Sequence, residues 1–242
     1  MRKIWIITLF PEYFKNFLEQ GVAAYALRGE RGVPFEVNLI SLREFSPKDF
    51  KGVDSAPYGG GPGMVFRPDV LKNALMEGVV KPGNYGDDFK DKLHVIFPSP
   101  RGQVWNNKVC IDFARRVYPN KDLVIICGRY EGVDERFLSK YVDEEFSMGD
   151  YILTGGELAA MAILDSSVRF IPGVLGNKDS SESESFQNSL LEHPQYTRPQ
   201  NFEGEEVPKV LLSGHHQKIK NYQQSERIRV TQERRPDLLE QR

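Results

Sequence analysis

The sequence predicts an α/β protein built around a parallel sheet. Short apolar runs rich in β-branched residues alternate along the chain with segments whose apolar residues recur at helical spacing. Strands that alternate with helices favour a parallel sheet covered on both faces, because each connecting helix packs on one face of the sheet. The length of 242 residues fits one large domain, or a main domain with a small second one.

The expected elements follow from these patterns in chain order. The predicted strands are the runs at Lys3–Leu9, Phe35–Ile40, Leu93–Phe97, Leu123–Cys127 and Glu144–Phe146. The predicted helices cover the segment from Phe14 to Gly29, then Pro68–Gly78, Asn107–Val117, Val133–Tyr141 and Glu157–Leu164. Pro68 and Gly78 support the second of these helices, since proline is favoured at the start of a helix and glycine just after its end.

The composition changes after Arg169, which indicates a domain boundary. Asn177–Ser185 is polar and acidic, as is typical of a flexible linker. We therefore expect a main domain at residues 1–168, a linker at 169–187 and a small, mainly helical domain at 188–242. From Gly214 onward, seven Lys and Arg residues stand against four Asp and Glu residues. Such a cluster is usually a solvated helix face, but next to a main domain it is also a candidate RNA-binding surface.

Charge and cysteine content narrow the class of protein. A net charge of -2 excludes a polybasic nucleic-acid coat, so any contact with RNA must use a local patch. The two cysteines, Cys110 and Cys127, lie in apolar runs without CxxC spacing, which indicates buried free thiols in a reducing compartment. No apolar run is long enough to cross a bilayer. We expect a cytoplasmic protein.

Three glycine-containing segments, Pro98–Gly102, Gly128–Gly132 and Ser147–Gly156, each follow a predicted strand. Ligands of open α/β sheets bind outside the carboxyl ends of the strands. One such segment alone is most simply a structural turn, but three together favour a small-molecule site. The ligand is not a common nucleotide, because the chain lacks both glycine-rich phosphate-binding motifs. The spacing of the histidines and cysteines also disfavours a zinc site.

A fourth segment, Tyr58–Met64, contains four glycines and a proline. It is either a surface turn or a loop shaped to admit something bulky, such as a nucleotide. Ordering so many glycines is costly in conformational entropy, which favours the second interpretation.

With these residues in view, the chain resembles the bacterial tRNA (guanine-37-N1)-methyltransferase family over nearly its whole length. The matching segments are Leu9–Pro11, Pro57–Met64, Ser99-Pro100 with Gly102, Cys127–Gly132, Asp134–Arg136, Gly149–Glu157, Arg169–Gly176, His193–Pro199, Val207-Pro208, Leu211–Gly214 and Arg234–Pro236. One glycine motif alone would be weak, but so many long motifs in the same order make coincidence untenable.

The resemblance implies a SPOUT-type fold, in which a parallel sheet carries a deep trefoil knot. It also implies a homodimer with the active site at the subunit interface. The methyl donor would be S-adenosylmethionine, and the target would be N1 of guanine 37 in tRNA, next to the anticodon, which maintains the reading frame. Some members of the family depend on magnesium, for which Glu131 is the candidate residue.

The same resemblance assigns residues to each ligand. The methyl donor would contact Ser99, Pro100, Gly128, Glu131, Ser147, Met148, Gly149, Asp150, Tyr151, Ile152, Leu153, Gly155 and Gly156. The tRNA and its guanine would contact Tyr58, Gly59, Gly60, Pro62, Gly63, His193, Tyr196, Arg198 and His216.

Two residues are the catalytic candidates. Guanine N1 carries a proton at neutral pH, so a carboxylate is needed as general base, and an arginine beside O6 can stabilise the developing charge. The resemblance gives these roles to Glu184 and Arg169. Glu184 stands where the family has Asp, which keeps the carboxylate but changes its reach. On composition alone, Glu184 is as readily one of several acids that keep a linker soluble.

Two other functions remain open at this point. The chain could be a SPOUT enzyme that acts on another RNA, or an RNA-binding protein that lost turnover through the exchange of Asp for Glu. The Tyr58–Met64 and His193–Pro199 segments disfavour the first, and the intact methyl-donor segments disfavour the second.

Overall fold

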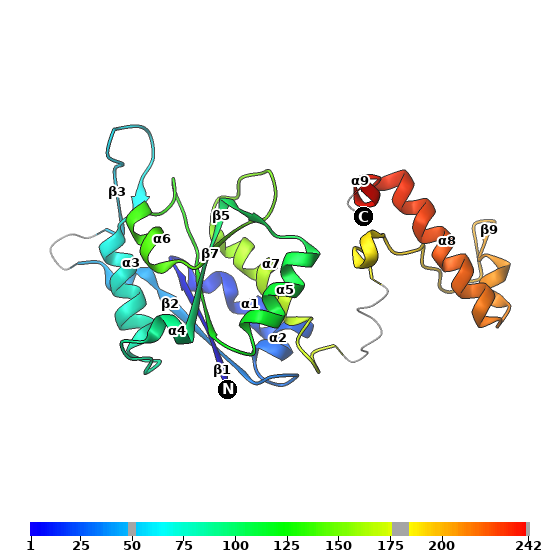
Figure 1. Ribbon diagram of the computed structural model, residues 1–242, viewed down its shortest axis with the longest axis horizontal. Coiled ribbons are helices and arrows are strands. Elements are labelled where there is room, and N and C mark those ends of the chain that lie inside the picture. Colours follow the sequence, from blue (N-terminus) through cyan, green and yellow to red (C-terminus); the bar gives the residue numbers. More distant parts are fainter. Residues whose placement is uncertain (48–51, 176–183, 241–242) are drawn as a thin grey trace. The chain divides into compact units, whose positions relative to one another are not determined.

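The computed structural model describes residues 1–47, 52–175 and 184–240, and the chain divides into two compact units, Met1–Gly176 and Asn177–Arg242. The first unit is an α/β domain with a five-stranded sheet (Figure 1). The strands are β1 (Arg2–Thr8), β2 (Phe35–Ser41), β5 (Leu93–Val104), β6 (Asp122–Ile126) and β7 (Glu144–Ser147). They lie in the order β2-β1-β6-β5-β7, and all neighbours are parallel. The predicted α/β class with a parallel sheet is confirmed.

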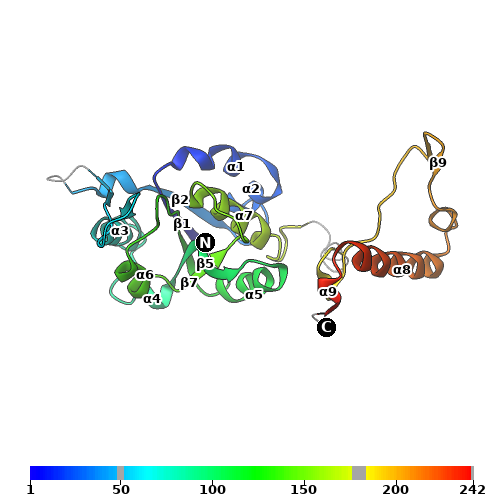
Figure 2. The same ribbon diagram turned by 90° about the horizontal axis from the view of Figure 1, so that it is seen from above.

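Helices cover both faces of this sheet, as Figure 2 shows. One face packs on α1 (Lys15–Glu19), α2 (Gly21–Leu27), α5 (Asn107–Val117) and α7 (Gly156–Val168). The other packs on α3 (Pro68–Leu75), α4 (Phe89–Lys92) and α6 (Glu135–Tyr141). The side chains of β1 alternate between the two cores: Ile4 and Ile6 face one, and Trp5 and Ile7 face the other. Because both faces are buried, the three inner strands, β1, β6 and β5, contain continuous apolar runs, whereas the edge strands β2 and β7 also contain polar residues.

Three sequence predictions need correction. The helix expected from Phe14 to Gly29 is interrupted, because Gln20 is extended and Gly21 has a φ of 88°. The helix that begins at Pro68 does not end at Gly78; it widens into a π-helical turn at Met76–Val80. Pro98–Gly102 is no loop, since β5 continues to Val104 after a register shift against β7. Gly102 permits this close pairing, because a Cβ there would overlap the backbone of β7.

Several short elements carry no sequence periodicity and were not predicted. These are the hairpin of β3 (Asp54–Ser55) with β4 (Val65–Phe66), the hairpin of β8 (Asn201–Phe202) with β9 (Glu205–Glu206), and 3-10 turns at Pro11–Phe14, Leu42–Phe45, Gln187–Ser189 and Lys209–Leu212. The β3–β4 hairpin closes the glycine-rich loop at its base, so the long-range pairing of Asp54 with Phe66 fixes both ends of that loop.

The second unit centres on α8 (His216–Arg234), followed by α9 (Asp237–Glu240). Only Thr231 is buried on α8, and the helix has no sustained apolar face. Most of the predicted linker segment Asn177–Ser185, and Arg242 at the end of the basic cluster, lie outside the described residues. Within those described, no helix is both long and apolar enough to span a bilayer.

Candidate active site

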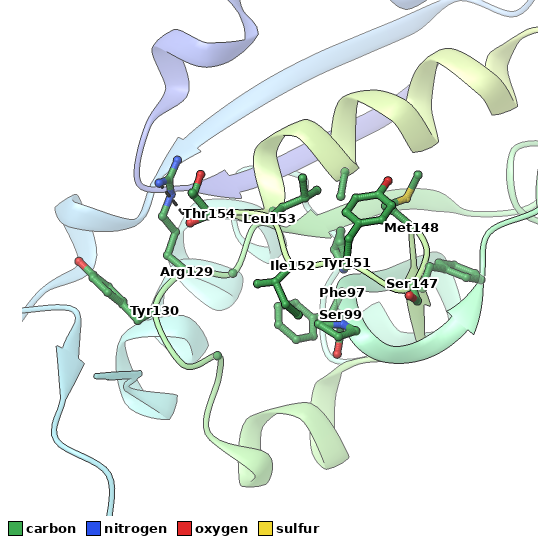
Figure 3. A pocket seen from close by; sticks show the side chains of 18 of the residues that line it. Phe97, Ser99, Arg129, Tyr130, Ser147, Met148, Tyr151, Ile152, Leu153 and Thr154 are labelled. Atoms are coloured by element: carbon green, nitrogen blue, oxygen red, sulfur yellow. Dashed lines mark hydrogen bonds between the residues drawn. The ribbon is translucent and has the colours of Figure 1, made fainter. Parts of the chain in front are cut away.

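A cavity of about 340 Å³ lies at the carboxyl ends of β6 and β7, beside the middle of β5. This volume falls in the range of small-molecule sites. Three stretches line it: residues 97–100 of β5, 128–132 after β6, and residues 146–148 and 151–156 around the turn after β7, with Ala159 on α7. Figure 3 shows Arg129 and Tyr130 at one end of the cavity and Ser147 and Met148 at the other.

Two glycines let these stretches approach one another closely. A Cβ on Gly128 would lie 2.6 Å from the ring of Phe97, and a Cβ on Gly156 would lie 2.9 Å from the Cα of Cys127. The Gly156 N–H also donates to the Gly128 carbonyl over 2.8 Å. Any side chain at either position would push the stretches apart, so the sequence motifs here reflect packing as well as ligand access.

The rim of the cavity carries exposed apolar side chains. Tyr151 and Ile152 line the cavity, yet they are 58% and 77% exposed. Gly149, with a φ of 131°, turns the chain just before them, and its N–H donates to the Ser147 hydroxyl over 3.3 Å. Exposed apolar surface at a concave site is typical of a surface that a ligand or another chain covers.

A buried ion pair supports one wall. Glu157, at the start of α7, is 1% exposed, and its carboxylate lies 3.0 Å from a guanidinium nitrogen of Arg129. The Thr8 hydroxyl at the end of β1 donates to the same carboxylate over 2.8 Å. That hydroxyl in turn accepts the Phe10 N–H over 3.0 Å. The pair therefore joins three separate elements: the end of β1, the stretch after β6 and the start of α7.

Arg129 keeps its charge in this setting. Burial by itself would lower the pKa of Arg129, but hydrogen bonds and charge from Glu157 and Tyr13 outweigh it, so that this pKa is raised overall. The guanidinium also lies 4.5 Å from the centre of the Phe10 ring. A carboxylate as buried as Glu157 is tolerated because it is paired with this charge and accepts a hydrogen bond.

Glu131 connects the cavity with the glycine-rich loop. It lines the cavity, and its N–H donates to the Met64 carbonyl over 2.9 Å. Its carboxylate fills the space beside Gly63 that a Cβ would occupy. Within the described parts of the chain, no group of three or more His, Cys, Asp or Glu residues could hold a metal ion. Glu131 is therefore not a member of such a group.

The structure brings most of the expected methyl-donor residues together. Ser99, Pro100, Gly128, Glu131, Ser147, Met148, Tyr151, Ile152, Leu153, Gly155 and Gly156 all line the cavity, whereas Gly149 and Asp150 do not. Eight further residues that were not expected from the sequence also line it: Phe97, Pro98, Arg129, Tyr130, Gly132, Phe146, Thr154 and Ala159. Most of these residues are next in sequence to an expected residue, and Ala159 lies one helical turn after Gly156. Proximity in the chain and helical spacing could therefore have predicted them.

The tRNA candidates lie in two places. In the first unit, Tyr58 is 98% exposed, and Gly59, Gly60 and Gly63 have positive φ. Pro62, in the same loop, is also exposed. In the second unit, Tyr196, Arg198 and His216 are exposed, and His193 is half-buried with Nδ1 at 3.0 Å from the Pro194 carbonyl oxygen.

Neither of the two catalytic candidates is among the residues that line this cavity. Arg169 caps the carboxyl end of α7, whereas Gly155 and Gly156, at the amino end, line the cavity. A 13-residue helix is about 20 Å long, which exceeds the reach of an arginine side chain. Glu184 belongs to the second unit and is half-buried there.

The fold and the site together define a class: an α/β protein with a small-molecule cavity at the carboxyl edge of a parallel sheet. Residues 2–241 match the family described as tRNA (Guanine-1)-methyltransferase TrmD, and the chain belongs to that family. It is 45% identical to a tRNA (guanine-N(1)-)-methyltransferase of Bartonella tribocorum, over 96% of this chain and 93% of the relative. It is 46% identical to one of Ruegeria sp., over 98% and 91%, and 44% identical to one of Fervidobacterium nodosum, over 98% and 89%.

Proposed function

We propose that this protein transfers a methyl group from S-adenosylmethionine to N1 of guanine 37 in tRNA. The observation that carries the proposal is the cavity between residues 97–100, 128–132 and 146–156, formed by segments that also carry the family resemblance. A guanine next to the anticodon that carries this methyl group helps to maintain the reading frame. We also propose that the protein is cytoplasmic, because its proposed substrate is tRNA.

The cavity suits S-adenosylmethionine chemically. Its lining combines apolar side chains such as Phe97, Ile152 and Leu153 with backbone groups of glycine-containing turns, which favours a flat base and a ribose over a phosphate. When bound, S-adenosylmethionine supplies a methyl group already activated on a sulfonium. We also propose that the turn after β7 forms the SPOUT knot. The close packing of Gly156 against Gly128, with β7 beside β5 at the sheet edge, supports this.

We propose a homodimer with the active site at the subunit interface. Arg169 and the cavity lie at opposite ends of α7, so Arg169 can act on a guanine at the methyl donor only in the site of a second copy. The exposed Tyr151 and Ile152 at the rim are suited to being covered by that copy.

Proton transfer is assigned to the protein's own side chains. The Glu184 carboxylate accepts the proton of guanine N1 as the N1–methyl bond forms and the bond from that methyl group to the sulfonium sulfur breaks. The Arg169 guanidinium donates hydrogen bonds toward O6, where negative charge develops as N1 loses its proton. The longer side chain of Glu, compared with the family's Asp, is accommodated by a small shift of the backbone around Glu184.

The tRNA contacts are proposed for the glycine-rich loop and the second unit. The candidates are Tyr58, Gly59, Gly60, Pro62, Gly63, His193, Tyr196, Arg198 and His216. The basic cluster after Gly214 contributes less than its composition suggests. Arg229 pairs with Glu226 and Glu233, Arg235 pairs with Asp237, and Arg227 binds backbone carbonyls. Among the described residues of the cluster, this leaves Lys218, Lys220 and Arg234 as the better phosphate ligands.

A methylation assay tests the function. Unmodified tRNA with guanine at position 37 should accept one methyl group at N1, and the matched tRNA with adenine there should accept none. Methylation of another RNA in place of this tRNA would favour a different SPOUT activity. Tight tRNA binding without any methylation would favour a binding protein. The same assay with a chelator measures the magnesium requirement, and loss of activity would direct attention to Glu131.

A further inference from the structure

The backbone that carries Glu184 is held by α8. The guanidinium of Arg227 donates to three carbonyl oxygens of one segment: Leu191 over 3.1 Å, Gln187 over 3.2 Å and Glu184 itself over 3.4 Å. One turn further along α8, the Thr231 hydroxyl accepts the Leu191 N–H over 2.9 Å. We call Arg227 and Thr231 the α8 clamp.

The clamped segment has an unusual backbone. Phe186, Asn188 and Ser189 have φ values of 75°, 55° and 57°. Each non-glycine residue in this region costs on the order of 1 kcal/mol or more, so three within four residues persist only where surrounding contacts determine them. Inside the segment, the Phe186 N–H donates to the Leu190 carbonyl over 2.7 Å. The α8 clamp supplies the contacts from outside.

The burial pattern of α8 agrees with this role. Thr231 is its one buried residue in the described chain, with 0% exposure, and Leu190 in the clamped segment is 2% exposed. Thr231 also donates to the Arg227 carbonyl over 2.6 Å, which ties the two clamp residues together. The face of α8 that excludes water is therefore the face that holds the Glu184 segment.

We infer that Arg227 is a positioning residue for Glu184, acting through the backbone rather than as a phosphate ligand of tRNA. The inference rests on the proposed role of Glu184 as general base. Because Arg227 lies on α8, the orientation of α8 on the tRNA would also set the orientation of the Glu184 carboxylate. A polar side chain that fixes three carbonyls of one turn limits that turn to one conformation.

Two substitutions in the full-length protein distinguish a role in positioning Glu184 from a role in binding a tRNA phosphate. Arg227→Gln removes most of the donors and the charge, and Thr231→Val removes only the hydroxyl at nearly constant volume. Arg229→Gln is the matched control, because Arg229 lies two residues away on α8 and pairs with Glu226 and Glu233 at the surface. Helicity by circular dichroism identifies any variant that fails to fold.

Three measurements apply to each variant. In single turnover with saturating tRNA and S-adenosylmethionine, both clamp substitutions should slow methyl transfer, by roughly 10- to 100-fold for Arg227→Gln, as misplaced catalytic groups do. Amide hydrogen exchange at Phe186, Leu190 and Leu191 should become faster in both. The dependence of tRNA affinity on salt should be unchanged, since no phosphate contact is lost. Arg227→Lys, which can still reach one carbonyl, should recover part of the rate.

The outcomes are distinct. A shallower salt dependence for Arg227→Gln, with normal exchange and a normal rate for Thr231→Val, would make Arg227 a phosphate ligand and overturn the inference. Faster exchange with unchanged rates would also overturn it, because the clamp would not affect catalysis. Absence of guanine-N1 methylation in the unsubstituted protein would instead refute the proposed function, while the exchange data would still report on the clamp.

Discussion

The two units of this chain are stabilised in different ways. In Met1–Gly176, two apolar clusters fill the faces of the sheet, and large side chains such as Phe14, Phe66 and Phe113 are 0% exposed. In the second unit, the contacts around α8 that the structure describes are mainly polar, and its one buried helix residue is Thr231. Burial of apolar surface is the dominant favourable term in folding, so the first unit has the larger source of stability of its own.

The difference teaches where rigidity is needed. A methyl donor must be held at a defined place, and its cavity is built from turns anchored to a buried sheet. The segment that carries Glu184 is held instead by hydrogen bonds from Arg227 and Thr231 on α8, without a large apolar core behind it. Substitutions in the two units should therefore have different effects.

Truncation of the core should affect only the first unit strongly. Phe113→Ala removes a ring in contact with those of Trp105, Tyr118 and Phe146 at 5.3 to 5.8 Å between centroids. We expect a loss of about 3–5 kcal/mol in the free energy of unfolding, as for other buried phenylalanines. Both tryptophans of the chain, Trp5 and Trp105, are in the first unit, so urea unfolding followed by their fluorescence reports on it.

The matched change in the second unit is Ile228→Ala on α8, where the side chain is 37% exposed. Its cost should stay within about 0.5 kcal/mol, as for surface sites. A loss comparable to that of Phe113→Ala, measured by circular dichroism, would mean that α8 is buried in the assembled protein and that the contrast between the units is wrong.

Removal of the proposed base should affect chemistry and leave methyl-donor binding intact. Glu184→Gln keeps the size of the side chain but cannot accept the N1 proton, so the single-turnover rate should fall by about 100-fold or more. Glu184→Asp should retain substantial activity. Glu192→Gln is the control, because its carboxylate is engaged at the surface with Gln195. Equal rates for Glu184→Gln and Glu192→Gln would contradict the assignment.

Two glycines of the same loop should respond differently to alanine. Both Gly60 and Gly63 have positive φ, so each alanine costs about 1–2 kcal/mol in the loop. At Gly60 the added Cβ meets open space, whereas at Gly63 it would displace the Glu131 carboxylate, which lines the cavity. Calorimetry should therefore show methyl-donor affinity weakened about tenfold, or 1.4 kcal/mol, by Gly63→Ala only. A similar loss of methyl-donor affinity for Gly60→Ala would mean that displacement of the Glu131 carboxylate is not the cause.

The smallest effects concern tRNA phosphates. Lys218→Gln and Lys220→Gln should each lower the slope of log affinity against log salt by up to about 0.9, the contribution of one phosphate contact. Arg229→Gln should leave the slope unchanged, because Glu226 and Glu233 already neutralise that guanidinium. Fluorescence anisotropy with labelled tRNA over a salt series provides the measurement. Equal slopes for all three variants would place the phosphate contacts elsewhere on the chain.

The sequence alone predicted the fold class and the outline of the cavity. Its apolar runs predicted the three inner strands, because a strand buried on both faces is largely apolar, and the runs at Phe35–Ile40 and Glu144–Phe146 predicted the two edge strands. Its glycines marked the turns where backbone approaches backbone, as at Gly128 and Gly156. These are local properties, and side-chain type and spacing are enough to reveal them.

The contacts between residues far apart in the chain could not be predicted in this way. The hydrogen bond from Thr8 to Glu157, the partner of Arg129, spans 149 residues of chain, and that from Arg227 to Gln187 spans 40. From the sequence, Arg227 was one charge in a basic cluster, yet its guanidinium binds three carbonyls of the Glu184 segment. Likewise β5 runs past Pro98 because β7 offers it a second register. Such partners come from distant parts of the chain, and local periodicity does not contain them.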